Sequence, residues 1–307
     1  MDIRAILMGV AFAFMWSSAF ASARMIVQDA PPLWALAARF AASGIVACAI
    51  ARAGGASFRI PRAQWRAVVI FGLCQNALYL GLNFVAMQRI EASLAAIIAS
   101  TMPLLVAALG WAVFGDRVRP MGLAGLAAGV VGVAIIMGAR LSGGADLASI
   151  GLCVAGALAL AIATLTVRGA AGGGSVLMVV GLQMFVGAAI LAVVAAATEV
   201  PQVDWNGRLL LAFVYTTLIP GVLATWVWFL LVARIGAVRA ATFHFLNPFF
   251  GVIVAALTLG EHIGRNDVIG VAVVAAGILA VQLSRQKPAA PAPVPGVSAS
   301  APAAPKA

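Results

Sequence analysis

Charged residues are scarce in this sequence, and their scarcity excludes a soluble globular protein. Only 9% of its 307 residues are Asp, Glu, Lys or Arg, whereas a soluble domain carries about 25%. Hydrophobic residues make up 64% of the chain, and apolar runs near the ~20 residues that cross a bilayer recur along nearly its whole length. Runs of this kind indicate helices, because a membrane β-barrel shows short alternating segments instead. The sequence therefore predicts an all-α integral membrane protein.

The apolar runs divide into ten expected membrane spans. Their approximate bounds are residues 3–26, 32–52, 66–88, 91–114, 121–139, 148–168, 175–197, 209–233, 238–260 and 267–284.

Acidic residues are absent from the middle of every expected span, and cysteine and histidine are rare. The three cysteines, Cys48, Cys74 and Cys153, lie in apolar spans without the spacing of a metal site. No HExxH motif and no credible pair of nucleophile and base is present. We therefore expect no catalytic residue, no metal and no cofactor. A carboxylate proton relay is also missing, which leaves proton coupling through His244 or facilitated flow.

One stretch of the sequence occurs twice. Residues 89–133 and 234–278 align without a gap at an offset of 145, which pairs Pro103 with Pro248 and Asp116 with Glu261. A period this long indicates a duplicated half rather than a solenoid unit. We predict two five-span repeats, at 3–139 and 148–284, and a disordered Ala/Pro-rich tail at 285–307.

The odd number of spans per repeat predicts that the second repeat enters the membrane from the opposite side. Sorting the charges by loop puts thirteen basic residues on the side of both termini and five on the other. The positive-inside rule then places both termini in the cytoplasm. The net charge of +10 reflects this bias, so no nucleic-acid partner is expected. Inverted repeats predict a substrate site near the bilayer midplane, between the halves.

Polar residues at helical spacing mark two of the spans. Asn76, Tyr79 and Asn83 fall at i, i+3 and i+7 of the third span, on one face of an α-helix. His244 and Asn247 repeat the beginning of this spacing in the ninth span. Burying such groups unpaired in hydrocarbon is costly, so they are expected to face other helices or a wet cavity. A structural hydrogen bond and a role in proton or substrate handling both remain open for His244.

Arg39 is the only charge deep inside an expected span. A substrate carboxylate is one natural partner for such a group. Its counterpart in the second repeat is the neutral Gln183, however, and the arginine could equally snorkel outward or pair with backbone carbonyls.

Several segments together resemble the two EamA domains of the drug/metabolite transporter superfamily. They are Trp16-Ser17-Ser18-Ala19-Phe20, the stretch from Pro32 to Arg39-Phe40, the proline-centred fourth and ninth spans and the glycine-rich fifth and tenth spans. The resemblance covers residues 3–284. It implies ten helices, a central cavity lined chiefly by spans one, three, four, six, eight and nine, and export of amino acids or other metabolites. Exporters of aromatic amino acids are the nearest match, because the expected cavity is neutral, aromatic and hydrogen-bonding.

We therefore predict a monomeric secondary carrier of the bacterial inner membrane that exports aromatic and other neutral amino acids by alternating access. Export of another small metabolite or drug is the alternative, and a membrane-embedded enzyme and a non-transporting scaffold are the rivals from other classes. Apart from lipid and substrate, protons are the one further partner considered. The expected lining residues are Trp16, Ser17, Asn76, Tyr79, Asn83, Ser100, Thr101, Trp228, His244 and Asn247, with Pro103 and Pro248 as hinges and Arg39 as a candidate charge site.

Overall fold

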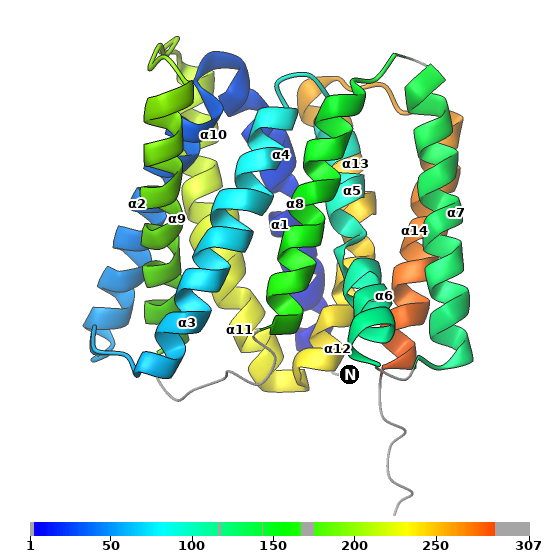
Figure 1. Cartoon of the computed structure of the whole chain (residues 1–307), viewed down its shortest axis with the longest axis horizontal. Helices are drawn as coiled ribbons and strands as arrows, with labels where there is room; N and C mark the ends of the chain where they lie inside the picture. Colours follow the sequence, from blue (N-terminus) through cyan, green and yellow to red (C-terminus); the bar gives the residue numbers. More distant parts are fainter. Residues whose placement is uncertain (1–2, 116–117, 143, 167–174, 286–307) are drawn as a thin grey trace, which may run out of the picture.

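The computed structural model describes residues 3–115, 118–142, 144–166 and 175–285. These residues form helices and no strand, and ten of the helical segments are long and apolar enough to cross a membrane. The prediction of an all-α protein with ten spans is confirmed. The helices stand side by side as a bundle (Figure 1). The tail predicted to be disordered lies outside the described residues, apart from Arg285.

The helices follow the expected spans closely. The first repeat contains α1 (Ile3–Asp29), α2 (Pro32–Ala53), α3 (Arg62–Phe71), the π-helix η1 (Gly72–Leu80), α4 (Gly81–Ala86), α5 (Ala92–Ser100), α6 (Met102–Phe114) and α7 (Pro120–Ser142). The second contains α8 (Leu147–Thr166), α9 (Val176–Thr198), α10 (Gly207–Leu218), the π-helix η2 (Ile219–Leu223), α11 (Ala224–Ile235), α12 (Ala237–Ala241), the 3-10 helix η3 (Thr242–Leu246), α13 (Asn247–Leu259) and α14 (Arg265–Ser284).

The two repeats share their irregular points. The third span of each contains a π-helix, and η1 overlaps η2 when the 145-residue offset is applied. The fourth span of each is interrupted just before its proline, so that Pro103 and Pro248 are the second residues of α6 and α13. Proline is tolerated there because the first turn of a helix leaves its N–H groups unpaired. The same two helices end at Gly115 and Gly260, which adopt the left-handed conformation with φ of 67° and 66°.

Small residues allow the last helices of the two repeats to touch. A Cβ atom on Gly125 would lie 2.7 Å from the carbonyl oxygen of Gly277, and one on Gly132 would lie 2.9 Å from that of Gly270. At the offset of 145, Gly125 corresponds to Gly270 and Gly132 to Gly277. The two contacts are therefore equivalent, and α7 and α14 are related by an approximate twofold axis. Glycine is needed at these points because the backbones approach too closely for a side chain.

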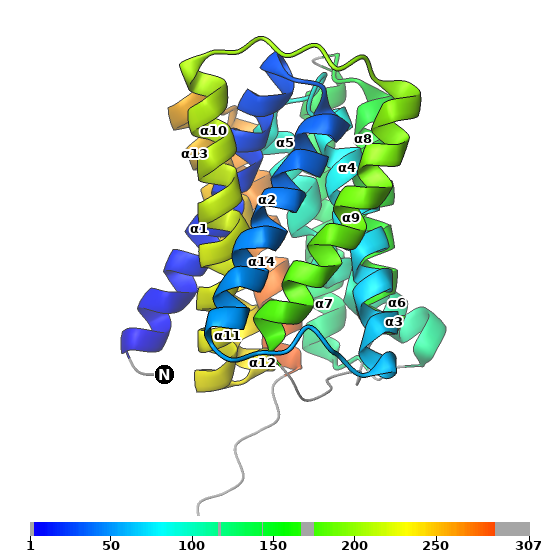
Figure 2. The same ribbon diagram turned by 90° about the vertical axis from the view of Figure 1, so that its left-hand side faces the viewer.

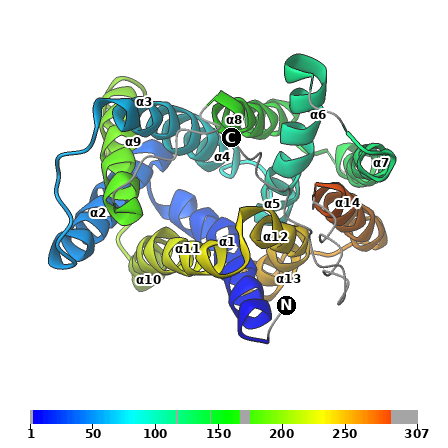
Figure 3. The ribbon, with the colours of Figure 1, turned by 90° about the horizontal axis from the view of Figure 1, so that it is seen from below.

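Seen from below, α7 and α14 occupy one end of the bundle and α2 and α9 the other, with the remaining helices between them (Figure 3). Side views show α2 and α9 side by side (Figures 1 and 2). Large apolar side chains such as Val130, Val193 and Leu257 are more than two-thirds exposed on the outside of the bundle. Lipid tails would cover them in a membrane.

The first helix begins and the last helix ends on the same face of the bundle (Figure 1). We call it the terminal face, and the opposite face, which carries the α1–α2, α4–α5, α7–α8, α9–α10 and α13–α14 connections, the far face. Assignment of the terminal face to the cytoplasm remains a prediction from the charge distribution.

Candidate functional site

A cavity lies between the two repeats in the half of the bundle near the terminal face. It has two adjoining parts of about 340 and 460 Å³, a size range typical of small-molecule sites. Both parts are lined by Trp16, Met102, Leu160, Thr164, Trp228 and His244. The lining extends to Val176 at the start of α9 and Arg285 after α14, both at the terminal face. The cavity therefore opens toward that face.

Aromatic rings form one wall of the cavity. Phe12 lies 5.7 Å from Trp16, 4.7 Å from Trp228 and 5.4 Å from His244, measured between ring centroids. Trp228 and His244 are themselves 5.2 Å apart. These distances are typical of favourable aromatic contacts. The wall is built from α1, α11 and η3, so it joins elements of both repeats.

Apart from Arg285 at the opening, the polar groups of the cavity are mainly amides, hydroxyls and one imidazole. The Asn247 side-chain nitrogen lies 2.9 Å from His244 Nδ1, which satisfies that ring nitrogen, while Asn247 Oδ1 is buried without a partner. The Ser100 hydroxyl donates to its own helix, to the Ala96 carbonyl at 2.6 Å. Gln75 and Gln183 add two further amides to the part near α9. The described lining contains no acidic side chain.

The structure brings most of the predicted lining residues to this cavity. Those present are Trp16, Tyr79, Ser100, Trp228, His244 and Asn247, together with the predicted hinge residue Pro103.

Five of the predicted lining and hinge residues lie outside this cavity. One of them, Asn83, lines a separate space described below. Ser17 is buried with no partner for its hydroxyl, and the Thr101 hydroxyl donates to the Ile98 carbonyl at 2.7 Å. Pro248 is buried at the start of α13. Asn76 donates to the Gln183 carbonyl oxygen at 2.9 Å and thus packs against α9.

The π-helix η1 explains the position of Asn76. The expectation of a single polar face assumed an α-helix from Asn76 to Asn83, but residues 72–80 have the wider π-helical turn. The wider turn changes the rotation per residue, so Asn76 and Tyr79 no longer share a face. Only Tyr79 reaches the cavity.

The cavity also contains residues that the sequence interpretation left out of the site. In the sequence, Phe12, Met102 and Thr164 are not distinguished from the other residues of their apolar spans. Gln75 and Gln183 carried a usable signal, because each places a polar amide deep in an apolar span.

A second, much smaller space lies on the far-face side of Trp16 and Tyr79. This chamber measures about 40 Å³ and is lined by Trp16, Ala19, Phe20, Ala23, Arg39, Tyr79, Leu80, Asn83, Phe84, Met87, Thr216 and Pro220. Arg39 is 5% exposed, so it does not snorkel to the surface. Its Nε donates to the Thr216 carbonyl at 3.2 Å, and its guanidinium carbon lies 5.2 Å from the centroid of the Phe40 ring.

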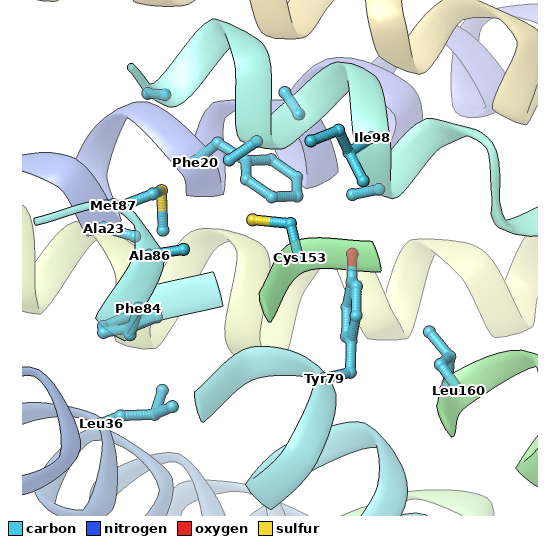
Figure 4. Close-up of a cluster of buried hydrophobic side chains, with 14 of the residues drawn as sticks. Phe20, Ala23, Leu36, Tyr79, Phe84, Ala86, Met87, Ile98, Cys153 and Leu160 are labelled. Atoms are coloured by element: carbon cyan, nitrogen blue, oxygen red, sulfur yellow. The ribbon is translucent and has the colours of Figure 1, made fainter. Parts of the chain in front are cut away.

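Apolar packing separates the chamber from the far face. Phe20, Phe84 and Met87 belong to the large buried cluster, which also includes Ile98 and Cys153 (Figure 4). Phe84 and Met87 are no more than 2% exposed. In the same view Tyr79 extends from its helix toward the neighbourhood of Cys153.

Polar contacts join the helix ends at the far face. The Glu261 carboxylate accepts from the backbone N–H groups of Ala92 at 2.7 Å and Ser93 at 2.9 Å. Arg140 binds Asp267 at 3.1 Å and also pairs with Glu91. These contacts and the apolar cluster close the bundle on the side opposite to the opening of the cavity.

Comparison with known proteins connects this architecture to a family of membrane proteins. A family model described as the EamA-like transporter family matches residues 3–138 and 147–283. An uncharacterised transporter of Bacillus subtilis, YvbV, is 22% identical over 268 residues, which are 87% of this chain and 88% of that protein. An S-adenosylmethionine/S-adenosylhomocysteine transporter of Chlamydia trachomatis is 28% identical over 134 residues, which are 44% and 40% of the two chains. A solved crystal structure, 22% identical with a TM-score of 0.66, covers 92% of this chain and 98% of its own and has the same fold.

Proposed function

The chain belongs to the EamA-like transporter family, and from that premise we propose that this multi-pass membrane transporter exports aromatic and other neutral amino acids. The observation that carries the proposal is the composition of the cavity. An aromatic wall of Phe12, Trp16 and Trp228 faces a space that also holds the amides of Gln75 and Gln183. Aromatic rings supply a flat apolar surface for a side chain, and amides hydrogen-bond the polar backbone of an amino acid.

The charges around the cavity support neutral substrates over other classes. A cationic drug would be stabilised by a buried carboxylate, and the described lining has none. A phosphate ester would call for several clustered cations. The only arginine or lysine side chains that line the described cavity and chamber are Arg285, at the terminal face, and Arg39, in the chamber.

The proposed transport cycle is alternating access. In the described state the cavity opens to the terminal face and the far face is closed. With the terminal face in the cytoplasm of a bacterial inner membrane, this is the state that takes up a substrate for export. Rocking of one repeat against the other would open the far face, with Pro103 and Pro248 as points where the fourth and ninth spans bend.

A second candidate substrate is a nucleoside-bearing amino acid of the S-adenosylhomocysteine type, which lacks the sulfonium charge of S-adenosylmethionine. The chlamydial relative carries that substrate in its name, although it matches less than half of this chain. An adenine base could stack on the same aromatic wall. Such a substrate shares the amino-acid head group with the first candidate, so both are tested together.

The test is counterflow in proteoliposomes that contain the purified full chain. Labelled aromatic, small neutral, acidic and basic amino acids, S-adenosylhomocysteine and S-adenosylmethionine are offered with and without a proton gradient. We expect exchange of the aromatic amino acids without a gradient. Exchange only with a gradient would direct attention to His244. Failure of every amino acid to exchange would refute the proposed substrate class and leave the family assignment intact.

A further inference from the structure

The chamber around Arg39 is the counterpart, in the inverted repeat, of the part of the cavity near α9. When the two repeats are aligned at an offset of 144, Arg39 pairs with Gln183 and Phe20 with Thr164. At an offset of 145, Asn83 pairs with Trp228. The first member of each pair lines the chamber, and the second lines the cavity.

The correspondence also holds in the other direction. Thr216 and Pro220 of the second repeat line the chamber, and their counterparts in the first repeat, Phe71 and Gln75, line the cavity. The two spaces are therefore equivalent, but one measures about 40 Å³ and the other about 460 Å³. If the repeats exchange conformations during transport, the chamber widens when the far face opens.

The chamber contains hydrogen-bonding capacity that the described part of the chain does not use. Arg39 has five N–H donors, and with the described residues it makes a single hydrogen bond, from Nε to the Thr216 carbonyl. No carboxylate of the described residues forms an ion pair with it. A buried cation without a counter-ion is costly, so the site favours an anionic ligand.

Asn83 supplies an acceptor in the same chamber. Its side-chain nitrogen donates to the Tyr79 carbonyl at 2.7 Å, while its Oδ1 is buried with no partner among the described residues. The residue is 1% exposed. An unpaired buried acceptor is expected to gain from a donor on a ligand. The chamber thus presents donors for an anion and an acceptor for an N–H group.

We propose that the chamber is the subsite for the head group of the transported substrate, in which Arg39 binds its carboxylate and Asn83 Oδ1 accepts from its ammonium group. The inference rests on the proposed function and specifies the group that is recognised, a free α-carboxylate. Trp16 and Tyr79 line both the chamber and the cavity, so they contact the rest of the substrate when its head group is bound. A volume of 40 Å³ exceeds the roughly 10–15 Å³ that one water requires on the same measure, so a carboxylate fits.

This subsite gives a role to the main difference between the repeats. The space open to the terminal face has the neutral Gln183, and the space that leads to the far face has the charged Arg39. A carboxylate in the cavity is therefore attracted in the direction of export. Without this role, Arg39 would be a buried charge whose described partners are one backbone carbonyl and the Phe40 ring.

The experiment compares ligands that differ only in the head group. In counterflow of labelled phenylalanine by the reconstituted full chain, the competitors are phenylalanine and phenylalaninamide, which lacks the carboxylate. Because hydrogen bonds to charged groups are among the stronger ones, the amide should compete about tenfold less well. Equal competition by the two would overturn the inference while leaving amino-acid transport established.

Two variants separate recognition from structure. Arg39→Gln introduces the residue of the second repeat and can still donate to the Thr216 carbonyl, whereas Arg39→Lys keeps the charge. We expect Arg39→Gln to bring phenylalanine and the amide to nearly equal potency and Arg39→Lys to retain most of the roughly tenfold preference. A structural role would instead weaken both competitors alike in Arg39→Gln, and that result also overturns the inference.

A binding measurement removes the dependence on amino-acid transport. Thermal unfolding of the purified full chain is recorded with phenylacetate and with its neutral analogue phenylacetamide. The inference expects stabilisation by phenylacetate only, and its loss in Arg39→Gln. Stabilisation of that variant to the same degree, or none in the unsubstituted protein at concentrations up to about 10 mM, well above a millimolar dissociation constant, would contradict a carboxylate site. These outcomes are informative even if no amino acid is exchanged.

Discussion

Trp228 is the residue whose removal should most directly affect substrate binding. It contacts Phe12 and His244 and lines both parts of the cavity. An aromatic contact contributes about 0.5–1.5 kcal/mol beyond its buried area, so Trp228→Ala should raise the KM for aromatic amino acids by about three- to tenfold. The matched control is Trp205→Ala, because Trp205 is 74% exposed near the far face. Equal effects of the two substitutions on the KM of proteoliposome uptake would show that Trp228 does not contribute to substrate binding.

Asn76 should affect stability more than transport. Its amide donates to the Gln183 carbonyl and does not line the cavity. Asn76→Ala should therefore lower the free energy of unfolding by about 1 kcal/mol, the usual value of one hydrogen bond, and leave the KM unchanged. Thermal unfolding in detergent and counterflow measure the two effects. A raised KM with unchanged stability would place Asn76 in the site, as its spacing in the sequence had indicated.

At the scale of single residues, the sequence predicted the kinds of side chain that line the cavity better than their exact positions. Trp16, Trp228, His244 and Asn247 were recognisable because aromatic and polar groups are conspicuous in an apolar span. Asn76 was predicted on the face of Tyr79 because spacing alone does not reveal the π-helical turn of residues 72–80.

The contact between α13 and α5 at the far face should help to set the balance between the two transport states. Glu261 joins the end of α13 to the first N–H groups of α5. Replacing a carboxylate at a helix N-terminus costs about 0.3–1 kcal/mol, up to about 2 when it is partly buried. A change of about 1 kcal/mol alters the ratio of two states about fivefold. Glu261→Gln should therefore favour opening of the far face.

Labelling of a cysteine in the chamber measures that opening. Asn83→Cys, in a background without Cys48, Cys74 and Cys153, should react faster with an impermeant maleimide when Glu261→Gln is added. Glu199→Gln is the control, because Glu199 caps α2 in the same way, at 3.0–3.1 Å from the Leu33 and Trp34 nitrogens. It also joins the two repeats, but it does so between α2 and α9 at one end of the bundle rather than between α5 and α13 (Figure 3). Equal acceleration by both would mean that neither contact is specific to the transport movement.

The contact of α7 with α14 tests the packing of the repeats. Gly125→Ala would place a methyl group 2.7 Å from the Gly277 carbonyl, and overpacking of this kind costs about 1–3 kcal/mol. Gly138 lies in the same helix with nothing within 4 Å of its added Cβ. Gly138→Ala should be neutral or slightly stabilising, and thermal unfolding distinguishes the two. A neutral Gly125→Ala would mean that the helices separate easily.

The ten spans could be predicted from the sequence for a physical reason. A membrane helix must be apolar over the ~20 residues that match the hydrocarbon thickness, and it needs no distant partner to satisfy its backbone. The breaks at Pro103 and Pro248 could also be predicted, because proline lacks the backbone N–H that donates the helical hydrogen bond. The far-face contacts were not, since they depend on how loops meet in space.

Orientation is the property of the whole molecule on which the direction of transport depends. An inward-open cavity supports uptake for export only if the terminal face lies in the cytoplasm. Thirteen basic residues lie on the terminal side and five on the opposite side, and the positive-inside rule predicts this orientation from that difference. The ten spans and the position of both ends of the helical bundle on one face (Figure 1) mean that this charge bias orients the whole molecule at once.

Single cysteines on the two faces test this orientation in intact cells. Ser57 is exposed in the α2–α3 connection at the terminal face, and Gln202 is exposed in the α9–α10 connection at the far face. In a background without the three native cysteines, an impermeant maleimide should label Gln202→Cys in whole cells and Ser57→Cys only after the membrane is broken. The reverse pattern would turn the same cavity toward the outside. The transporter would then be described in a state that accepts substrate for uptake, and Arg39 would attract a carboxylate into the cell.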